Sequence, residues 1–160
     1  MTLWDWAIAA YARPSVADAC LTMQDTFGQN VPLLLSAVWA AGEGRPLKLP
    51  AAVAVTHDWD AVVVGPLRAL RRDLEAARPP IGDGAREALR VQVKAVELQA
   101  ERVLLEALEA LAAEVAQPQI DCLDALAGTA SAWACARDLP SPDLSEIKHL
   151  AGLICCCGRA

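Results

Sequence analysis

Residues 85–117 read AREALRVQVKAVELQAERVLLEALEALAAEVAQ, a run of about thirty residues without glycine or proline. An apolar row advances through this run in alternating steps of four and three residues, and a second row begins where the first ends. The first row is Leu89, Val93, Val96, Ala100, Val103 and Ala107, and the second is Leu104, Leu108, Leu111 and Val115. Charged residues occupy the other faces, so the run predicts one long amphipathic helix with partners along its length.

The rest of the chain divides into shorter segments that also favour helices. Of its 160 residues, 55% are hydrophobic and only 4% are aromatic, and no segment alternates polar and apolar residues as strands do. We therefore expect an all-α, single-domain bundle of about six to seven helices around the long helix of residues 85–117. Residues 1–140 form the helical domain in this interpretation, and residues 141–160 form a C-terminal helix with a cysteine-rich tail.

Capping residues and prolines predict where the shorter helices begin and break. Thr2 and Asn30 each precede an apolar run, where their side chains can accept hydrogen bonds from free backbone amides. Ser15 and Ser141 are predicted to start two further helices beside a neighbouring proline. Gly65-Pro66 interrupts a helix that begins near residue 50, because proline lacks an amide hydrogen and its ring crowds the preceding turn. The sequence thus predicts a kinked helix there.

The charge and the ends of the chain limit its partners and its location. A formal net charge of −6 opposes binding to nucleic acid and to anionic membranes, so neither is expected as a partner. Residues 1–12 lack the basic region of a signal peptide, and the longest uncharged apolar run, residues 31–41, is about half the length of a bilayer span. The six cysteines follow no disulfide framework, which fits a reducing compartment. We expect a cytoplasmic protein.

Several short motifs, taken together and in order, carry a resemblance to a known family. The first half contributes LWDWA at 3–7, YARP at 11–14, ACL at 19–21, QD at 24–25, GQNV at 28–31, LLL at 33–35 and Trp39. The second half contributes VV at 62–63, PLRA at 66–69, RR at 71–72, Lys94, EL at 97–98 and AER at 100–102. Over residues 3–111 the chain resembles an uncharacterised family of proteobacterial proteins of about this length. The resemblance implies a bacterial origin and a helical domain, and it transfers no catalytic residue.

A set of aromatic and polar residues near the N-terminus forms the first candidate site. It comprises Trp4, Trp6, Tyr11, Gln24, Asp25, Gln29 and Asn30. Aromatic rings can wall a pocket for an apolar ligand, while amides and carboxylates orient that ligand. The alternative is structural: the rings belong to the core, Asn30 is a helix cap, and the other polar groups hold a turn.

Three arginines within five positions form the second candidate site. Arg68, Arg71 and Arg72 follow the predicted kink in an otherwise acidic chain. Guanidinium groups bind carboxylates and phosphates bidentately, so the cluster could dock an acidic peptide or a phosphate-bearing ligand. The alternative is a solvated face, or salt bridges to Glu97 and Glu101 on the long helix.

No metal and no cofactor is expected. Glu146 and His149 have the Glu-x-x-His spacing of carboxylate-bridged metal sites, but a second such motif is missing. His57 has acidic neighbours and is interpreted as a partly buried helix residue. Cys155, Cys156 and Cys157 lack the C-x-x-C spacing of zinc sites and are interpreted as incidental thiols of the tail.

The leading hypothesis is a non-catalytic helical module that binds another protein, because amphipathic surface is abundant and no catalytic motif is recognised. The alternative is a small-molecule or lipid-binding bundle, with or without catalytic activity, whose pocket lies among the first three helices. A homodimer through Leu104, Leu108 and Leu111 is a further hypothesis.

Overall fold

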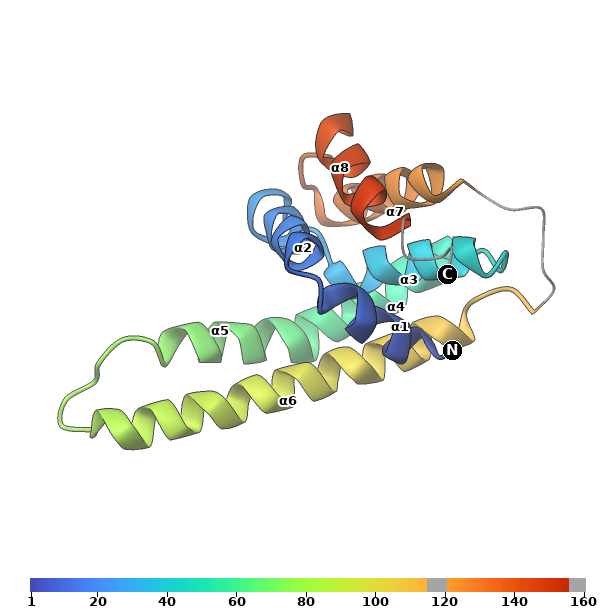
Figure 1. The fold of residues 1–160 in the computed structure, drawn as a ribbon. Helices are drawn as coiled ribbons and strands as arrows, with labels where there is room; N and C mark the ends of the chain where they lie inside the picture. Colours follow the sequence, from blue (N-terminus) through green and yellow to red (C-terminus); the bar gives the residue numbers. More distant parts are fainter. Residues whose placement is uncertain (115–120, 156–160) are drawn as a thin grey trace.

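The computed structural model describes residues 1–114 and 121–155, and it contains eight α-helices and one π-helical turn in these ranges (Figure 1). The elements are α1 (Leu3–Tyr11), α2 (Pro14–Phe27), α3 (Val31–Gly42), α4 (Leu49–Trp59), η1 (Asp60–Val64), α5 (Gly65–Asp73), α6 (Asp83–Ala110), α7 (Cys122–Arg137) and α8 (Leu144–Cys155). Because α4, η1 and α5 follow one another without a loop, they form one interrupted helix, and the predicted all-α fold is confirmed.

The long helix α6 ends earlier than the sequence predicted, at Ala110 instead of residue 117. The next residues leave the helix because they pair with the loop before α4. The Lys48 amide donates to the Leu111 carbonyl at 3.1 Å, the Ala113 amide donates to the Pro46 carbonyl at 3.0 Å, and Arg45 Nε donates to the Ala113 carbonyl at 2.7 Å. Residues 115–117 of the predicted helix lie outside the described residues.

The first apolar row of α6 is only partly buried. The residues of α6 that are buried are Val93, Glu97, Ala100, Leu104, Leu105 and Leu108. Leu89, Val96 and Val103 were predicted on the inward row, but they are 48%, 52% and 40% exposed. A helix has 3.6 residues per turn, so residues seven apart drift about 20° backward, and this row lies beside the packed face instead of on it.

The most buried helix is α3, which crosses the centre of the body. All residues from Val31 to Ala41 are buried, as the uninterrupted apolar run predicted. Asn30 caps this helix by accepting the Leu33 amide at 3.0 Å, and Gly28 ends α2 in the left-handed region at φ 62°. One correction concerns α2, which begins at Pro14 without a side-chain cap, so Ser15 is not its N-cap.

The predicted kink is a π-helical turn, η1, placed directly before Gly65 and Pro66. The Gly65 amide, which follows this turn, donates to the carbonyl of Asp60, five residues earlier. Widening the helix by one residue relieves the clash between the Pro66 ring and the carbonyl four residues earlier. A Cβ atom on Gly65 would lie 2.8 Å from the Asp60 carbonyl oxygen, so the turn requires glycine at this position.

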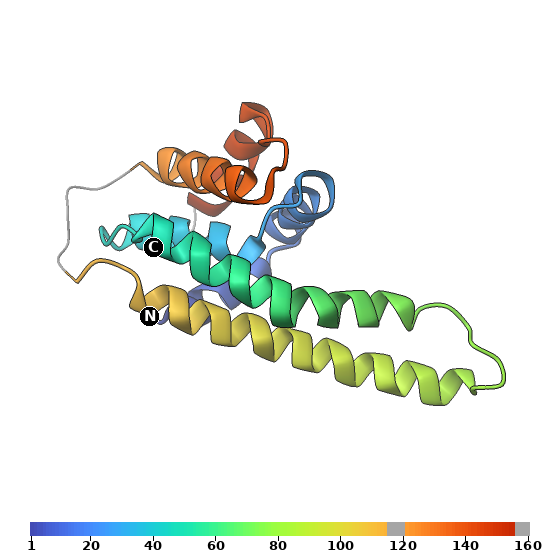
Figure 2. The same ribbon diagram turned by 180° about the vertical axis from the view of Figure 1, so that it is seen from behind.

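The last two helices complete the core above α3, as Figure 2 shows from behind. Trp133 of α7 is buried and donates its ring N–H to the Gly28 carbonyl at 2.9 Å. Ile147, Leu150 and Ile154 of α8 are buried in the same core. The start of α8 was predicted wrongly: the carboxylate of Asp143, not Ser141, accepts the Glu146 amide at 3.1 Å.

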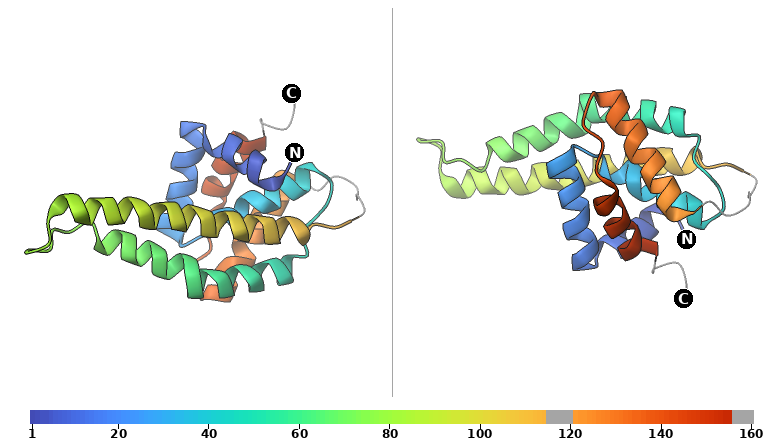
Figure 3. Two further views of the ribbon diagram at one scale, coloured as in Figure 1. Left: turned by 90° about the horizontal axis from the view of Figure 1, so that it is seen from below. Right: turned by 90° about the horizontal axis from the view of Figure 1, so that it is seen from above.

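Helices α5 and α6 run antiparallel and project beyond the other helices as a hairpin, which Figure 3 shows from two sides. At the far end of the hairpin, Arg86 of α6 donates hydrogen bonds to the carbonyls of Leu74 and Glu75, where α5 ends. These bonds join the two helices there. No helix in the described ranges is both long enough and apolar enough to cross a membrane.

Candidate functional site

A small recess lies where α1, α2, α3 and α6 meet, and it gathers several of the predicted site residues. Its volume is about 150 Å³. Its walls are mainly apolar and include Trp4, Ile8, Tyr11, Gln24, Leu98 and Glu101. Three of these, Trp4, Tyr11 and Gln24, belong to the N-terminal set that the sequence indicated. The recess is therefore the candidate functional site.

The recess is stabilised on one side by contacts between α1 and α6. The guanidinium of Arg102 lies 5.3 Å from the centre of the Trp4 ring, a cation–π contact. The Leu3 amide donates to Glu109 Oε2 at 2.9 Å, which fixes the start of α1 on the same helix. The first contact holds the Trp4 ring against α6, and the second holds the start of α1 there.

Glu101 is the acidic residue that lines the recess, and it also belongs to an ion-pair network between α6 and α5. Arg68 Nη2 lies 3.3 Å from Glu101 Oε1, and Arg68 Nε lies 3.1 Å from Glu97 Oε1. Arg71 Nε lies 2.6 Å from the other oxygen of Glu97. Burial raises the pKa of Glu101, although the charge of Arg68 opposes this shift.

Two of the three arginines in the cluster therefore form ion pairs with carboxylates of the same protein. Arg68 and Arg71 are only 17% and 22% exposed at their side chains, and they form the ion pairs with α6 that the sequence suggested as one alternative. Arg72 is 59% exposed and lies 3.6 Å from Asp25 on α2, so it bridges the hairpin to the rim of the recess. Arg72 is consequently the member of the cluster with the most surface for a partner.

Tyr11 places its hydroxyl in this same electrostatic environment. Its pKa is raised chiefly by burial and further by the nearby groups Cys20, Glu101 and Asp25, while Arg68 lowers it. The hydroxyl therefore stays protonated at neutral pH and can donate a hydrogen bond. Together with the Gln24 amide, it gives the recess neutral polar groups beside its apolar walls.

The remaining residues of the N-terminal set do not line the recess. Trp6 packs against the hydrophobic core, and Asp25 lies on the surface beside Gln24. Gln29 is buried, and its side-chain amide has no hydrogen-bond partner in the part of the chain that the structure describes.

Sequence reasoning did not assign Leu98 or Glu101 to this site. The facing Arg68 and the i, i+4 pair Glu97 and Glu101 were a signal for the ion pairs, but nothing in the spacing indicated a recess beside them.

Asn30 caps α3 and does not line the recess, which leads to a test of its role. Replacing Asn30 by alanine should lower the free energy of unfolding by about 1 kcal/mol, because the buried Leu33 amide loses its acceptor. Serine at the same position keeps an acceptor and should restore most of this loss. Urea denaturation of the three proteins measures the difference. A stable Asn30→Ala protein would show that the cap is unimportant.

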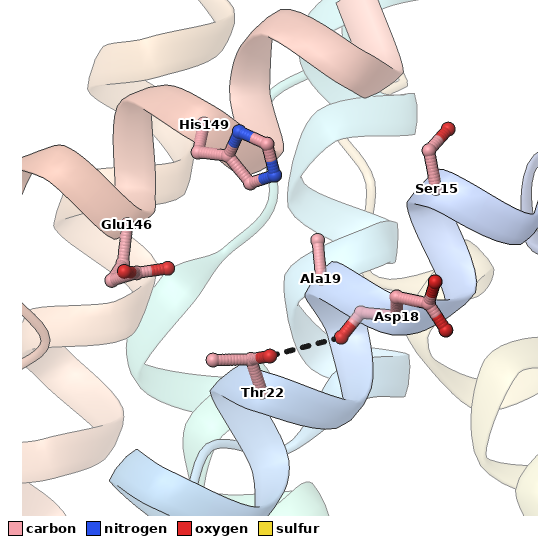
Figure 4. Close-up of a pocket in the computed structure, with 6 residues that line it drawn as sticks. All are labelled: Ser15, Asp18, Ala19, Thr22, Glu146 and His149. Carbon is pink, nitrogen blue, oxygen red and sulfur yellow. Dashed lines mark hydrogen bonds between the residues drawn. The ribbon is translucent and has the colours of Figure 1, made fainter.

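A second depression, an open groove of about 530 Å³, lies between α2 and α8 (Figure 4). Glu146 and His149 face it from α8, and Ser15, Asp18 and Thr22 face it from α2. The Asp18 carboxylate points away from Glu146 and His149, so these groups do not converge. Within residues 1–114 and 121–155, no three His, Cys, Asp or Glu side chains are placed to hold a metal ion.

The cysteines differ from the expectation of unlinked thiols. Cys122 is disulfide-bonded, whereas Cys20 and Cys135 are free. Burial raises the pKa of Cys20 to about 12, so its thiol is inert at neutral pH. The side chains of residues 155–157, which the sequence singled out, lie outside the described residues.

The fold and the recess define an all-α protein with a projecting helical hairpin and a small apolar recess beside it. The chain belongs to the family described as Protein of unknown function (DUF2390), whose model matches residues 2–108, more than half of the chain. The predicted resemblance to an uncharacterised family is thereby confirmed. Comparisons with curated proteins and with solved structures found no match.

Proposed function

We propose that this protein is a non-catalytic interaction module whose recess accepts one apolar side chain of a protein partner. The observation that carries the proposal is the size of the recess, about 150 Å³. Apolar cavities of about this volume hold a single benzene molecule, whereas sites for small-molecule ligands usually measure about 300–1,000 Å³. The recess therefore suits one aromatic or leucine-sized side chain better than a lipid or a cofactor.

The walls have the chemistry of an anchor pocket at a protein interface. Tightly bound interfaces concentrate their binding energy in a few aromatic, arginine or aliphatic residues that fill desolvated pockets. The rings of Trp4 and Tyr11 and the side chains of Ile8 and Leu98 supply the apolar contact. Gln24 and the Tyr11 hydroxyl can exchange hydrogen bonds with the partner backbone beside the anchor.

The rim adds charges that can select the partner. Asp25 and Arg72 are both more than half exposed at their side chains and lie 3.6 Å apart, so their mutual pairing is weak. A partner that carries an acidic and a basic residue next to its apolar anchor can exchange this pair for two intermolecular ones. Charges at a rim act mainly on the association rate and on specificity.

The alternative function, binding of a small molecule or lipid among the first three helices, has less support. A pocket of several hundred cubic ångströms, walled by Trp4 or Trp6 and reached by Gln24 or Asp25, would favour it. Trp4 and Gln24 do line the recess, but its volume is about half of the lower limit for small-molecule sites. The larger groove between α2 and α8 has no Trp, Tyr or Phe in its lining.

Filling the recess tests the proposal. Leu98 lines it and is 49% exposed, so Leu98→Trp should place an indole in the recess without disturbing the core. We expect partners captured from an extract of the source organism to be lost, with affinity at least about tenfold lower for any partner so identified. In methyl NMR spectra, indole added as a probe should shift Ile8 and Leu35 in the native protein but not in the variant.

Val91→Trp is the matched control, because Val91 lies two turns earlier on the same face of α6, is 59% exposed, and is not part of the recess. This variant should retain both the partner and the indole shifts. If Leu98→Trp keeps the captured partner, or if both variants lose it equally, the recess is not the binding site. Indole shifts without any recess-dependent partner would favour the small-molecule alternative.

A further inference from the structure

Glu101 gives the recess a charged hydrogen-bond acceptor among walls that are mainly apolar. Its Oε1 atom lies 3.3 Å from Arg68 Nη2, whereas no residue in the described ranges donates a hydrogen bond to its second oxygen, Oε2. The Oε2 atom is not buried, and the Glu101 side chain as a whole is 27% exposed. One acceptor in the lining of the recess is therefore open to a donor from outside the chain.

The charge of Glu101 is incompletely compensated by its surroundings. Burial raises the pKa of its carboxyl group and outweighs the charge of Arg68, which lowers this pKa. A further donor to Oε2 would stabilise the carboxylate. A purely apolar anchor, such as leucine or phenylalanine, would instead displace water from Oε2 without replacing its hydrogen bond. The recess therefore favours an anchor that carries a donor.

The charges beside the recess disfavour a cationic anchor. Among the described residues, the ion pairs of this region join Arg68, Arg71, Arg72 and Arg102 to Asp25, Glu97, Glu101 and Glu106, so positive and negative charges are equal in number. A lysine or arginine of a partner would add a positive charge next to Arg68, which already holds the same carboxylate. Juxtaposed like charges weaken association, so the donor of the anchor should be neutral.

Tryptophan is the neutral anchor residue that matches these groups best. Tyrosine also carries a donor, but its hydroxyl brings acceptor lone pairs, and the donors of Tyr11 and Gln24 serve the partner backbone in the proposed function. The indole N–H is a donor only, and its fused rings present apolar surface to Trp4 and Leu98. Tryptophan is also among the residues most enriched at the energetic centres of protein interfaces, and its N–H usually finds an acceptor when it is buried.

We infer that the recess recognises a tryptophan side chain of the partner protein, whose indole N–H donates to Glu101 Oε2. This inference rests on the proposed function, because it names the anchor that the recess accepts. Arg68 positions the carboxylate by binding Oε1, and Arg68 is itself held by Glu97 at 3.1 Å. An acceptor that is fixed before binding loses less conformational entropy when the anchor arrives.

The anchor belongs to a different protein and not to a second copy of this chain. Each tryptophan of the chain is buried or half-buried, and these residues are Trp4, Trp6, Trp39, Trp59 and Trp133. Leu104 and Leu108, which were predicted to form a homodimer together with Leu111, are 2% and 0% exposed and therefore cannot contact another chain.

Indole and 1-methylindole test the inference, because the methyl group of the second probe removes the ring donor. NMR titrations follow the methyl groups of Ile8 and Leu35, which line the recess. The native protein should bind indole at least about tenfold more tightly than 1-methylindole, because only indole can donate to the charged acceptor. Glu101→Gln keeps the shape of the side chain but removes its charge, so this ratio should fall to about threefold or less.

Glu87→Gln is the matched control, because it removes one negative charge from α6 at a side chain that is 50% exposed and does not line the recess. This variant should retain the native ratio, and circular dichroism checks that both variants are folded. Equal affinities of the two probes for the native protein overturn the inference and leave the proposed apolar anchor intact. A tenfold ratio that persists in Glu101→Gln also overturns it, because the methyl group then acts through its bulk. If neither probe shifts the Ile8 and Leu35 methyl groups, the recess itself is not a binding site, and the proposed function fails with the inference.

Discussion

Replacing Glu97 by glutamine is expected to lower the free energy of unfolding by about 2 kcal/mol. The Glu97 side chain is 9% exposed and accepts from both Arg68 and Arg71. Glutamine has nearly the same shape but no charge, so two partly buried guanidinium groups lose their common counter-ion. Removing one partner of a fully buried pair costs about 3–5 kcal/mol, and the partial exposure of both arginines lowers the expected value. Urea denaturation at neutral pH measures the loss.

Glu101→Gln is the matched control, one helical turn away on the same network. Burial raises the pKa of Glu101, so the folded state favours its protonated form. This preference for the protonated form stabilises the folded state fully at pH values below the usual carboxyl pKa. The stabilisation is lost as pH rises through the raised pKa of Glu101. The glutamine variant stays neutral, so its stability relative to the native protein should rise as pH increases above the usual carboxyl pKa of about 4. Equal losses in both variants would contradict the assignment of Glu97 as the central residue.

Gly65→Ala should lower the free energy of unfolding by about 2 kcal/mol, although alanine normally stabilises a helix. The added Cβ atom would lie 2.8 Å from the Asp60 carbonyl oxygen, which accepts the Gly65 amide in the π-helical turn. Either the turn opens or its hydrogen bond is lost. The turn also positions Trp59, whose ring N–H donates to the Ala100 carbonyl of α6 at 2.9 Å. Thermal and urea unfolding measure the effect.

Gly84→Ala is the control for this substitution. Gly84 lies in the first turn of α6, and a Cβ atom there meets no other atom within 4 Å. Alanine should therefore stabilise the protein by about 0.5–1 kcal/mol through its helix propensity and the smaller entropy of the unfolded chain. The two glycine variants are thus expected to change stability in opposite directions. A neutral or stabilising Gly65→Ala would show that the π-helical turn relaxes without loss.

Local chemistry made much of the fold predictable from the sequence. Thr2 and Asn30 cap their helices as expected, because a side-chain oxygen directly before a helix can accept a free backbone amide of its first turn. The apolar run of α3 could only be a central, buried helix. The kink at Pro66 was also predictable, but its form as a π-helical turn was not, because the register of the turn depends on how Trp59 and Asp60 pack against α6 and α7.

The candidate site was harder to predict because it depends on how separate helices meet. Trp4, Tyr11 and Gln24 were selected by residue type, and their convergence results from α1 and α2 packing against α6. The end of α6 and its exposed row were missed for the same reason. The backbone pairing of Leu111 with Lys48 outweighs helix propensity, and the apolar row offers no sign of which residues a neighbouring helix covers.

The hydrogen bond from Trp133 to Gly28 joins two parts of the chain that the family model separates. Gly28 lies inside the matched residues 2–108, whereas α7 lies beyond them, and α7 covers much of the apolar circumference of α3. The matched segment alone therefore lacks the helix that covers this part of α3. During synthesis, α3 leaves the ribosome before α7. The part of the α3 surface that α7 covers therefore stays exposed to water until the later segment has been made.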